Sequence, residues 1–219
     1  MLADSSNVTV VNNTVADNAT TGTVETRVAG VTHAAGLTSE VSNPAWQAQQ
    51  AGSAPHFSRP VQMFNNIFTT NTAYTYQASD NTLVDHGFLD FEVLGTAGTL
   101  NPSRSVLSVP YGPPANNIVG LDPLFLTAQA PTFLVQASAA DPNFVSVSLT
   151  RGNLPQGLLG DYHLSINSGA IDRGVAFQGT GSTRVNAPTR DIDQDFRPQL
   201  RTPGRQATPF DLGADEVPN

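Results

Sequence analysis

Residues 6–20 read SNVTVVNNTVADNAT, and the rest of the predicted fold follows from this pattern. A β-branched run, VTVV at 8–11, precedes Asn12-Asn13, and a second short run begins with Thr14-Val15. β-branched side chains favour strands, and asparagine adopts the left-handed backbone conformation of a tight corner more easily than most residues. The stretch therefore predicts two short strands joined by an Asn-Asn corner.

Two further copies of this pattern occur along the chain. One runs from Pro60 to Thr72, PVQMFNNIFTTNT, and a weaker one is NNIV at 116–119. The asparagine pairs start at positions 12, 65 and 116, so they are 65 − 12 = 53 and 116 − 65 = 51 residues apart. Such short strands need neighbours to satisfy their backbone groups, and an asparagine amide can bond to the copy stacked on it. One interpretation is a β-solenoid with parallel strands about 4.8 Å apart.

An ordinary β-sandwich is the alternative interpretation, because Asn-Asn pairs also occur in hairpin turns. A solenoid coil takes about 20–25 residues, so each gap would also have to hold an extra coil or a long loop. The two folds differ in one observable feature. In a solenoid the segment Val8–Val15 runs parallel to its hydrogen-bonded neighbour, whereas in a sandwich it runs antiparallel.

Composition indicates a folded β protein. The 219 residues suffice for one domain with its own core, and 39% are apolar while only 13% are charged. A disordered chain would be richer in charge and poorer in apolar residues. Cysteine does not occur, which excludes disulfides, thiolate zinc sites and cysteine nucleophiles.

The charge balance bears on partners. The net charge is −8, and all ten basic residues are arginine. An acidic chain of this kind is a poor candidate for binding nucleic acid or an anionic membrane surface, and no apolar run approaches the ~20 residues of a membrane span. The start, MLADSSNVTV, lacks the features of a signal peptide and already lies in a strand pattern. We therefore expect a fragment of a larger exported protein.

The pattern divides the chain into two regions. Residues 1–127 are predicted to form coils with a long loop insertion at 29–59, in which Asn43 caps a helical turn that begins at Pro44. Residues 128–219 are predicted to form the last coil or coils and a C-terminal cap. Further strands are expected at 23–28, 82–84, 88–94, 105–109, 132–136 and 143–149. A helical turn is expected at 168–173, ending at a left-handed Gly174.

Four motifs in the C-terminal half occur in a fixed order. They are LDPLF at 121–125, DYHLSINSGAIDRG at 161–174, DIDQDFRPQ at 191–199 and DLGADE at 211–216. Together with the Asn-Asn copies, they resemble the C-terminal region of bacterial secreted surface proteins with the right-handed parallel β-helix (pectate-lyase-like) fold. The resemblance implies an all-β, right-handed parallel β-helix fragment with an irregular C-terminal cap, located outside the cell or on its surface.

A calcium site is one interpretation of the D-x-D-x-D run formed by Asp191, Asp193 and Asp195. Calcium prefers hard oxygen ligands, but the positions that an EF-hand loop reserves for glycine and glutamate hold other residues. The alternative is that these aspartates cap turns and pair with Arg190 and Arg197. Calcium is the only cofactor that the sequence suggests.

An acid cluster on the predicted coils consists of Asp80, Asp85 and Asp90 with His86. Pectate-lyase-like enzymes use carboxylates with an arginine base, but no arginine occurs between positions 59 and 104. Glycoside hydrolysis needs two opposed carboxyl groups, which Asp85 and Asp90 supply only if their strands bring them together. Solvated turn acids are the alternative, and we assign no catalytic residue. His163 is interpreted as a packing residue.

The function expected from these features is that of a non-catalytic structural and binding domain that contacts polysaccharide or a protein neighbour. Tyr74, Tyr76 and Phe91 are the candidate exposed aromatics of its binding face. One alternative is the C-terminal part of a polysaccharide lyase or glycoside hydrolase with its active site on preceding coils. Another is a subunit that assembles through an open strand edge at residues 6–15.

Overall fold

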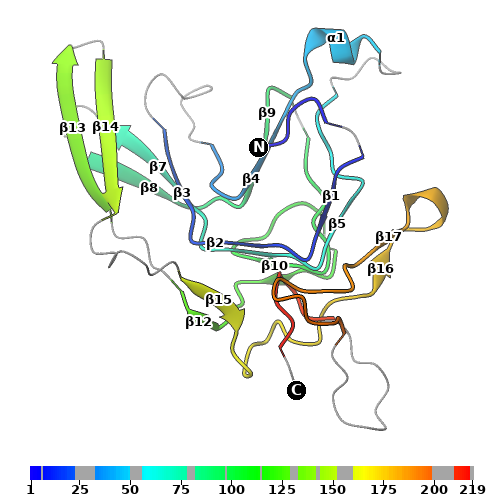
Figure 1. Cartoon of the computed structure of the whole chain (residues 1–219). Helices are drawn as coiled ribbons and strands as arrows, with labels where there is room; N and C mark the ends of the chain where they lie inside the picture. Colours follow the sequence, from blue (N-terminus) through cyan, green and yellow to red (C-terminus); the bar gives the residue numbers. More distant parts are fainter. Residues whose placement is uncertain are drawn as a thin grey trace, which may run out of the picture.

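The fold belongs to the all-β class, as predicted. The computed structural model describes residues 1–5, 7–22, 33–49, 56–77, 82–96, 98–113, 115–128, 133–141, 144–151, 160–198 and 210–217 (Figure 1). Within these residues, helix is limited to α1 (Pro44–Gln47) and the 3-10 helix η2 (Gly181–Thr183). None of the helices in these ranges has the length and apolar character required to cross a bilayer.

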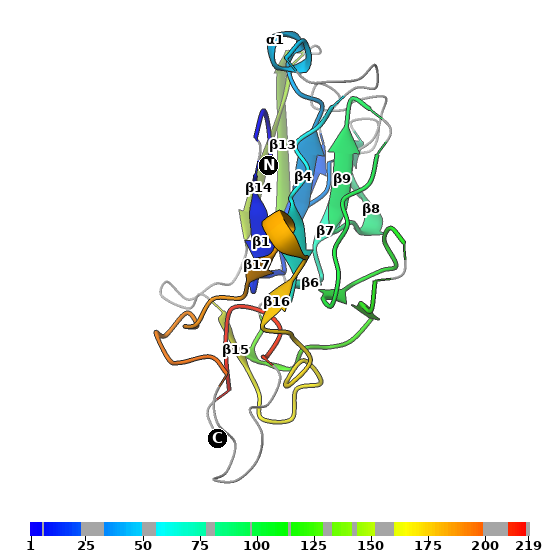
Figure 2. The same cartoon turned by 90° about the vertical axis from the view of Figure 1, so that its right-hand side faces the viewer.

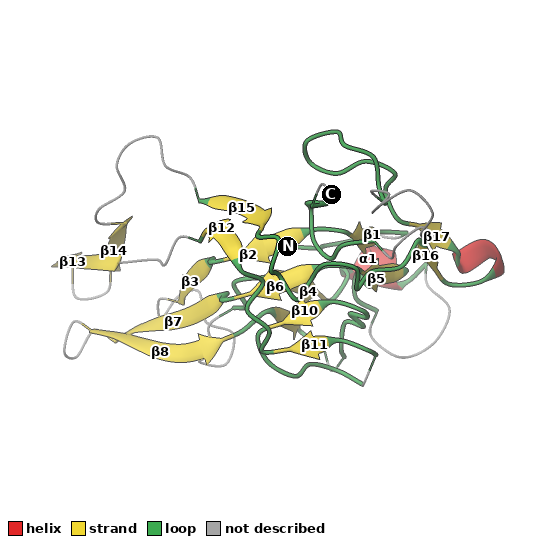
Figure 3. Cartoon of the chain, turned by 90° about the horizontal axis from the view of Figure 1, so that it is seen from below, coloured by secondary structure: helices red, strands yellow, loops and turns green. Residues whose placement is uncertain are grey.

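Four parallel ladders form the centre of the fold. Their strands are β1 (Thr9–Val11) with β5 (Gln62–Phe64); β2 (Thr14–Ala16), β6 (Ile67–Thr69), β10 (Val106–Leu107) and β11 (Ile118–Val119); β3 (Ala19–Gly22) with β7 (Thr72–Gln77); and β4 (Leu37–Glu40) with β9 (Phe91–Leu94). Figure 3 shows β2, β6, β10 and β11 following one another across one sheet, and Figure 2 shows β4 beside β9.

The first two Asn-Asn copies lie side by side in these ladders. Thr9 pairs with Gln62 and Thr14 with Ile67, both in parallel register. The parallel direction predicted for 8–15 is therefore confirmed, and the antiparallel sandwich arrangement is wrong for this segment. The chain passes through the four ladders twice in the same order. The first passage forms β1, β2, β3 and β4, and the second forms their respective partners β5, β6, β7 and β9.

Other pairs are antiparallel, so the expectation of continuous parallel coils is wrong for them. They are β7 with β8 (Thr82–Phe88), β12 (Phe125–Thr127) with β15 (Asp161–Leu164), β13 (Phe133–Asp141) with β14 (Phe144–Arg151), and β16 (Phe177–Gln178) with β17 (Val185–Asn186). Only residues 78–81 separate β7 from β8, and only 142–143 separate β13 from β14. Connections this short permit a hairpin, whereas a parallel return needs a crossover of about a dozen residues.

Local predictions had mixed outcomes in the N-terminal region. Asn43 caps α1 as predicted, since its side chain accepts a hydrogen bond from the Trp46 amide at 2.9 Å. The segment 29–59, predicted as loop, contains β4, which pairs with β9. The predicted strand 88–94 is divided between β8 and β9 by Leu89 and Asp90. The predicted strand at 23–28 lies outside the described residues.

The expected helical turn at 168–173 does not form. These residues make consecutive non-helical turns, in which Ser168 Oγ accepts the Ala170 amide at 3.1 Å. The left-handed residue is Asp172, with φ 58°, instead of Gly174. The predicted domain boundary between residues 127 and 128 stays a prediction.

Stacked corners hold neighbouring strands together. Four left-handed residues precede β2, β6, β10 and β11: Asn12 (φ 53°), Asn65 (φ 56°), Arg104 (φ 43°) and Asn116 (φ 56°). The residues that follow them, which we call the first corner ladder, are Asn13, Asn66, Ser105 and Asn117. In this ladder each backbone N–H donates to the side chain of the next member: Asn13 to Asn66 Oδ1 (2.9 Å), Asn66 to Ser105 Oγ (3.0 Å) and Ser105 to Asn117 Oδ1 (3.1 Å). The predicted bonding of asparagine to the stacked copy is confirmed.

A second polar ladder lies at the opposite ends of β2 and β6. Asn18 Nδ2 donates to Asn71 Oδ1 at 3.0 Å, and Asn71 Nδ2 donates to Asp90 Oδ1 at 2.9 Å. Asp90 Oδ2 accepts the Ser108 amide at 2.8 Å. The buried members, Asn71 and Asp90, are satisfied by these bonds, as the low dielectric of a protein interior requires.

Apolar clusters cover both faces of the central strands. Neighbouring residues Ile67 and Phe68 are 0% and 1% exposed and enter different clusters. Phe68 packs with Met63, Phe91, Leu100 and Leu107. Ile67 packs with Val106, Leu164, Ala170, Ile171, Leu212 and Val217. The C-terminal segments therefore close the outer face of β6, which explains why its strand is buried throughout.

Candidate functional site

The three predicted binding aromatics do not form one exposed face. Phe91 is 2% exposed, with its ring centroid 4.5 Å from Phe68 and 4.9 Å from Tyr111, so its predicted exposure is wrong. It begins β9, and its side chain belongs to the same apolar cluster as Phe68. Tyr74 is half-buried on β7, opposite Asp85 of β8. Tyr76 belongs to β7, and its side chain lies outside the described part of the chain.

The predicted acid cluster around His86 serves local structure. Asp90 is 2% exposed and bound into the second polar ladder, and burial raises the pKa of its carboxyl group. Asp85 is exposed and accepts the Gly87 amide at 2.7 Å. His86 Nε2 lies 2.8 Å from Thr75 Oγ1. Asp80 lies outside the described residues.

In the D-x-D-x-D run, the carboxylates of Asp191 and Asp193 have different hydrogen-bond partners. Asp191 is 7% exposed, and its Oδ1 accepts the amides of Asp193 at 2.9 Å and Asp195 at 2.8 Å. Asp191 thus caps a turn, as the alternative interpretation predicted. Arg190 stacks on the Phe196 ring at 4.0 Å instead of pairing with these aspartates. The Asp193 carboxylate points elsewhere, toward His163.

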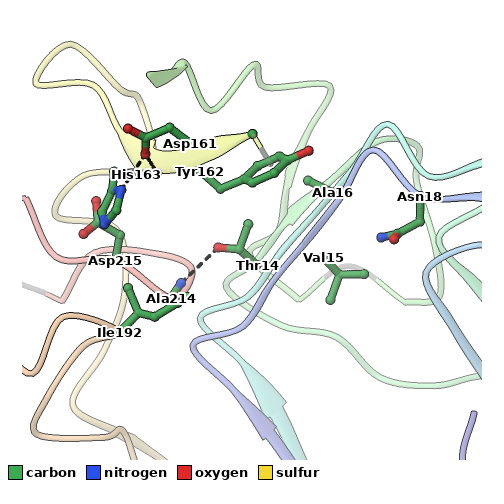
Figure 4. A pocket seen from close by; sticks show the side chains of 11 residues that line it. Thr14, Val15, Ala16, Asn18, Asp161, Tyr162, His163, Ile192, Ala214 and Asp215 are labelled. Carbon is green, nitrogen blue, oxygen red and sulfur yellow. Dashed lines mark hydrogen bonds and ion pairs between the residues drawn. The ribbon is translucent and has the colours of Figure 1, made fainter. Parts of the chain in front are cut away.

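One histidine and three carboxylates form a cluster of titratable groups beside β15. Its members, named here the His163 cluster, are His163, Asp161, Asp193 and Asp215. His163 Nδ1 lies 2.5 Å from Asp161 Oδ1, and Nε2 lies 2.8 Å from Asp193 Oδ2. Ligand atoms of His163, Asp193 and Asp215 all lie within 4.8 Å of one another. Figure 4 shows the His163 ring between Asp161 and Asp215.

The alternation of β15 explains how this cluster is presented. Asp161 and His163 are two residues apart and share one face of the strand, because successive side chains of a strand point to opposite sides. On the other face, Leu164 enters the core and Tyr162 packs edge-on against Phe125 with ring centroids 5.1 Å apart. The Tyr162 hydroxyl also donates to Asp17 Oδ2 at 3.0 Å. Asp17 is the left-handed residue that follows β2, with φ 55°, so this bond joins β15 to the end of β2.

Hydrogen bonding and burial perturb the charges of the cluster. The hydrogen bond to Asp161 raises the pKa of His163 to about 9, with a further contribution from the bond to Asp193. The same contact with His163 lowers the pKa of Asp161. Burial raises the pKa of Asp215, whose Oδ2 accepts the Leu164 amide at 2.8 Å. Each ring nitrogen of His163 thus lies within hydrogen-bonding distance of a carboxylate oxygen, an arrangement that favours the protonated ring.

A pocket of about 600 Å³ adjoins the cluster. Asp161, His163 and Asp215 line one side of it, and β2 lines the other (Figure 4). The Ala214 amide donates to Thr14 Oγ1 at 3.0 Å, which fixes the C-terminal segment against β2. The remaining lining residues are Val15, Ala16, Asn18, Gly160, Tyr162, Ile192 and Ala214. The volume falls in the range of sites for small molecules.

A buried arginine supports the segment that carries Asp215. Arg197 is 5% exposed; its Nη2 donates to Gly213 O at 3.2 Å, and its Nη1 lies 4.0 Å from Glu216 Oε2. Burial lowers the pKa of Arg197, while Glu216 and Asp191 oppose that shift. This guanidinium partly neutralises the acids beneath the His163 cluster and holds the last segment in place.

Sequence reasoning missed the cluster because its members are far apart in the chain. His163 was interpreted as a packing residue, yet its side chain is 41% exposed and contacts two carboxylates. Asp161 and Asp215 were not singled out. The available signal was that the members come from three of the four ordered C-terminal motifs, DYHL, DIDQD and DLGADE.

Comparison with protein-family models, with curated proteins and with solved structures finds no match for this chain.

Proposed function

We propose that the chain is a non-catalytic structural and binding domain, a right-handed parallel β-helix fragment of a larger exported surface protein. The observation that carries this proposal is the repeated passage of the chain through four parallel ladders in the same order. A β-helix requires this circulation. The motif order at 121–216, which resembles that of bacterial secreted β-helix proteins, supports the same assignment and an extracellular or cell-surface location.

Rigidity is the mechanical property that this arrangement supplies. The first corner ladder satisfies backbone amides with side chains, and apolar clusters cover both faces of β6. Rigid scaffolds of this kind position loops and pockets for recognition. The absence of cysteine from the sequence is compatible with export, because stacked strands with a continuous core need no disulfides.

The pocket beside β15 is the surface we assign to binding. It combines the Tyr162 ring with amide and carboxylate groups of Asn18 and Asp161, which suit the hydroxyl groups and apolar faces of a sugar. A polysaccharide is therefore the ligand class that we propose first. A protein neighbour is the alternative outcome of the binding test.

Binding and turnover are measured together on a panel of neutral and acidic polysaccharides. Calorimetry with the wild type and with Asp161→Asn tests the pocket, and Asp85→Asn on the exposed strand β8 is the matched control. Saturable binding that Asp161→Asn weakens and Asp85→Asn leaves unchanged supports the proposal. New reducing ends or unsaturated products would instead support the lyase or hydrolase alternative. Binding of none of these polysaccharides would contradict the choice of ligand class.

Assembly through a strand edge is the second candidate function. Within the described sheets, β1, β2 and β3 each occupy an outer position and have a hydrogen-bonded neighbour on one side. Such edges can accept another strand. Light scattering over a range of concentrations tests this, and a concentration-independent monomer mass would count against self-association.

A further inference from the structure

We propose that the His163 cluster binds a divalent first-row transition-metal ion, represented experimentally by zinc. His163 Nε2 and one carboxylate oxygen each from Asp193 and Asp215 are the ligands, and Asp161 orients the histidine. This inference depends on the geometry of the cluster and is independent of the polysaccharide proposal.

The three ligand atoms lie near enough to one another for a single ion to be shared after side-chain adjustment. Zinc binds imidazole nitrogen and carboxylate oxygen at about 2.1 Å, which places two tetrahedral ligands about 3.4 Å apart. His163 Nε2 is 2.8 Å from Asp193 Oδ2, and the Asp215 atom is within 4.8 Å of both. Small side-chain adjustments would thus bring three ligands around one ion.

Asp161 supplies the feature that distinguishes this cluster from a group of acids. Metal-binding histidines usually donate their second ring N–H to a carboxylate, which fixes the tautomer and the ring orientation. His163 Nδ1 already contacts Asp161 Oδ1, so Nε2 is the nitrogen left for the metal. When the ion binds, Nε2 loses its proton, and the contact with Asp193 is replaced by shared coordination.

Burial and charge also favour a cation here. Asp215 is 6% exposed, and yet one of its oxygens is directed at the histidine and Asp193. A carboxylate removed from water needs a counter-charge, which protonated His163 supplies in the metal-free protein and a bound cation would supply once Nε2 is deprotonated. The buried cation Arg197 is already directed at Gly213 O and Glu216.

The ligand set selects the class of metal. Imidazole nitrogen with two carboxylates suits zinc, manganese, iron or cobalt, whereas calcium and magnesium prefer oxygen ligands only. Three protein ligands leave at least one coordination position open. Asp215 and His163 both line the 600 Å³ pocket, so the open position faces a space that admits water or a small ligand.

Calorimetry on protein dialysed against EDTA tests the site with zinc chloride as the probe. We expect one ion per chain, and at least a tenfold loss of affinity in His163→Ala and in Asp193→Asn. Asp193 is exposed, so this variant should fold normally, as circular dichroism will verify. Asp161→Asn should weaken binding about tenfold. Asp195→Asn is the matched control, because this exposed acid of the same loop lies outside the cluster.

X-ray absorption of the zinc-loaded protein identifies the ligands. One imidazole nitrogen and carboxylate oxygens, with no sulfur, are expected. Zinc binding that persists unchanged in His163→Ala or Asp193→Asn would overturn the proposal, as would the lack of any saturable binding by the wild type. Calcium binding that requires Asp191 and survives His163→Ala would return the assignment to the D-x-D-x-D run.

Discussion

Removing the Asn66 side chain tests the corner stacking on which the fold depends. Asn66 is 0% exposed. Its Nδ2 donates to Val10 O and to Phe64 O, each at 2.9 Å, and its Oδ1 accepts the Asn13 amide at 2.9 Å. The side chain thus joins the first Asn-Asn copy to the second and also stabilises its own corner.

The structure sets the size of the expected effect. In Asn66→Ala, two carbonyl groups and one amide lose their side-chain partner. Leaving one buried polar group unsatisfied costs about 1–3 kcal/mol. Because relaxation and entry of water recover part of this loss, we expect a decrease of roughly 3–5 kcal/mol in the free energy of unfolding. That is a large fraction of the ~5–15 kcal/mol typical of a whole domain.

Urea unfolding followed by far-ultraviolet circular dichroism measures this difference. The matched control is Asn13→Ala, at the equivalent position of the first copy, where the asparagine is exposed. Its Nδ2 donates to Val11 O at 3.0 Å and to Asn66 Oδ1 at 3.2 Å. Water can replace these contacts at an exposed side chain, and the Asn13 backbone amide keeps its bond to Asn66 Oδ1, so we expect a loss of about 1 kcal/mol or less. Equal effects of the two substitutions, or a loss below about 1 kcal/mol for Asn66→Ala, would refute the stacking argument.

Three other predictions concern Gly213, with Gly181 as its control, Phe68 and the pH dependence of His163. Gly213→Ala should lower the unfolding free energy by roughly 1–3 kcal/mol, because φ is +89° and a new Cβ would lie 2.6 Å from Thr14 Oγ1. The control is Gly181→Ala, which should cost about 1 kcal/mol, because φ is +54° but no atom lies within 4 Å of a new Cβ. Phe68→Ala should lower the unfolding free energy by about 3–5 kcal/mol in the same urea assay, because this 1% exposed ring packs with Met63, Phe91, Leu100 and Leu107 in the core. The pKa of His163 is raised from 6.5 to about 9 in the folded chain. Without metal, the protonated side chain should therefore stabilise the fold fully below pH 6.5, and this stabilisation should be lost as the pH rises through 9. Because this side chain is 41% exposed, we expect roughly 1 kcal/mol, measured as the difference between wild type and His163→Ala; a difference independent of pH would contradict the assignment.

The corner pattern was predictable because it is local. A β-branched run followed by asparagine fixes both the strand and the left-handed residue, and the positive φ angles of Asn12, Asn65 and Asn116 follow from that chemistry. Arg104-Ser105 occupies the same corner position without the signal. There the bond from the Asn66 amide to Ser105 Oγ and the parallel neighbours impose the conformation. Tertiary contacts therefore overrode the local preference at this corner.

The errors came from features that no short segment contains. Phe91 was expected on an exposed face, but Leu89 and Asp90 separate β8 from β9, and Phe91 begins the second of these strands with its side chain in the core. The Asp90 carboxylate is needed in the second polar ladder, which connects residues far apart in the sequence. The His163 cluster likewise joins residues 161 to 215, and only the folded chain brings them within bonding distance.

The corner of the first copy and the His163 cluster are coupled through the last segment of the chain. Asn12 Nδ2 donates to Asp211 O at 3.0 Å and to Gly213 O at 3.2 Å, two residues before Asp215. Asn12→Gly removes these bonds while the left-handed backbone remains accessible. We expect a fall of about tenfold in zinc affinity although no ligand is changed, as when an outer partner of a metal site is lost.

Asn116→Gly is the matched control for this coupling. Asn116 has the same left-handed conformation, with φ 56°, but it is exposed and makes no hydrogen bond to the last segment within the described residues. Its substitution should leave zinc affinity unchanged. Equal zinc affinities for wild type and Asn12→Gly would mean that the Asp215 carboxylate is positioned by Arg197 and the Leu164 amide alone. The corner asparagine would then support the fold without contributing to the site.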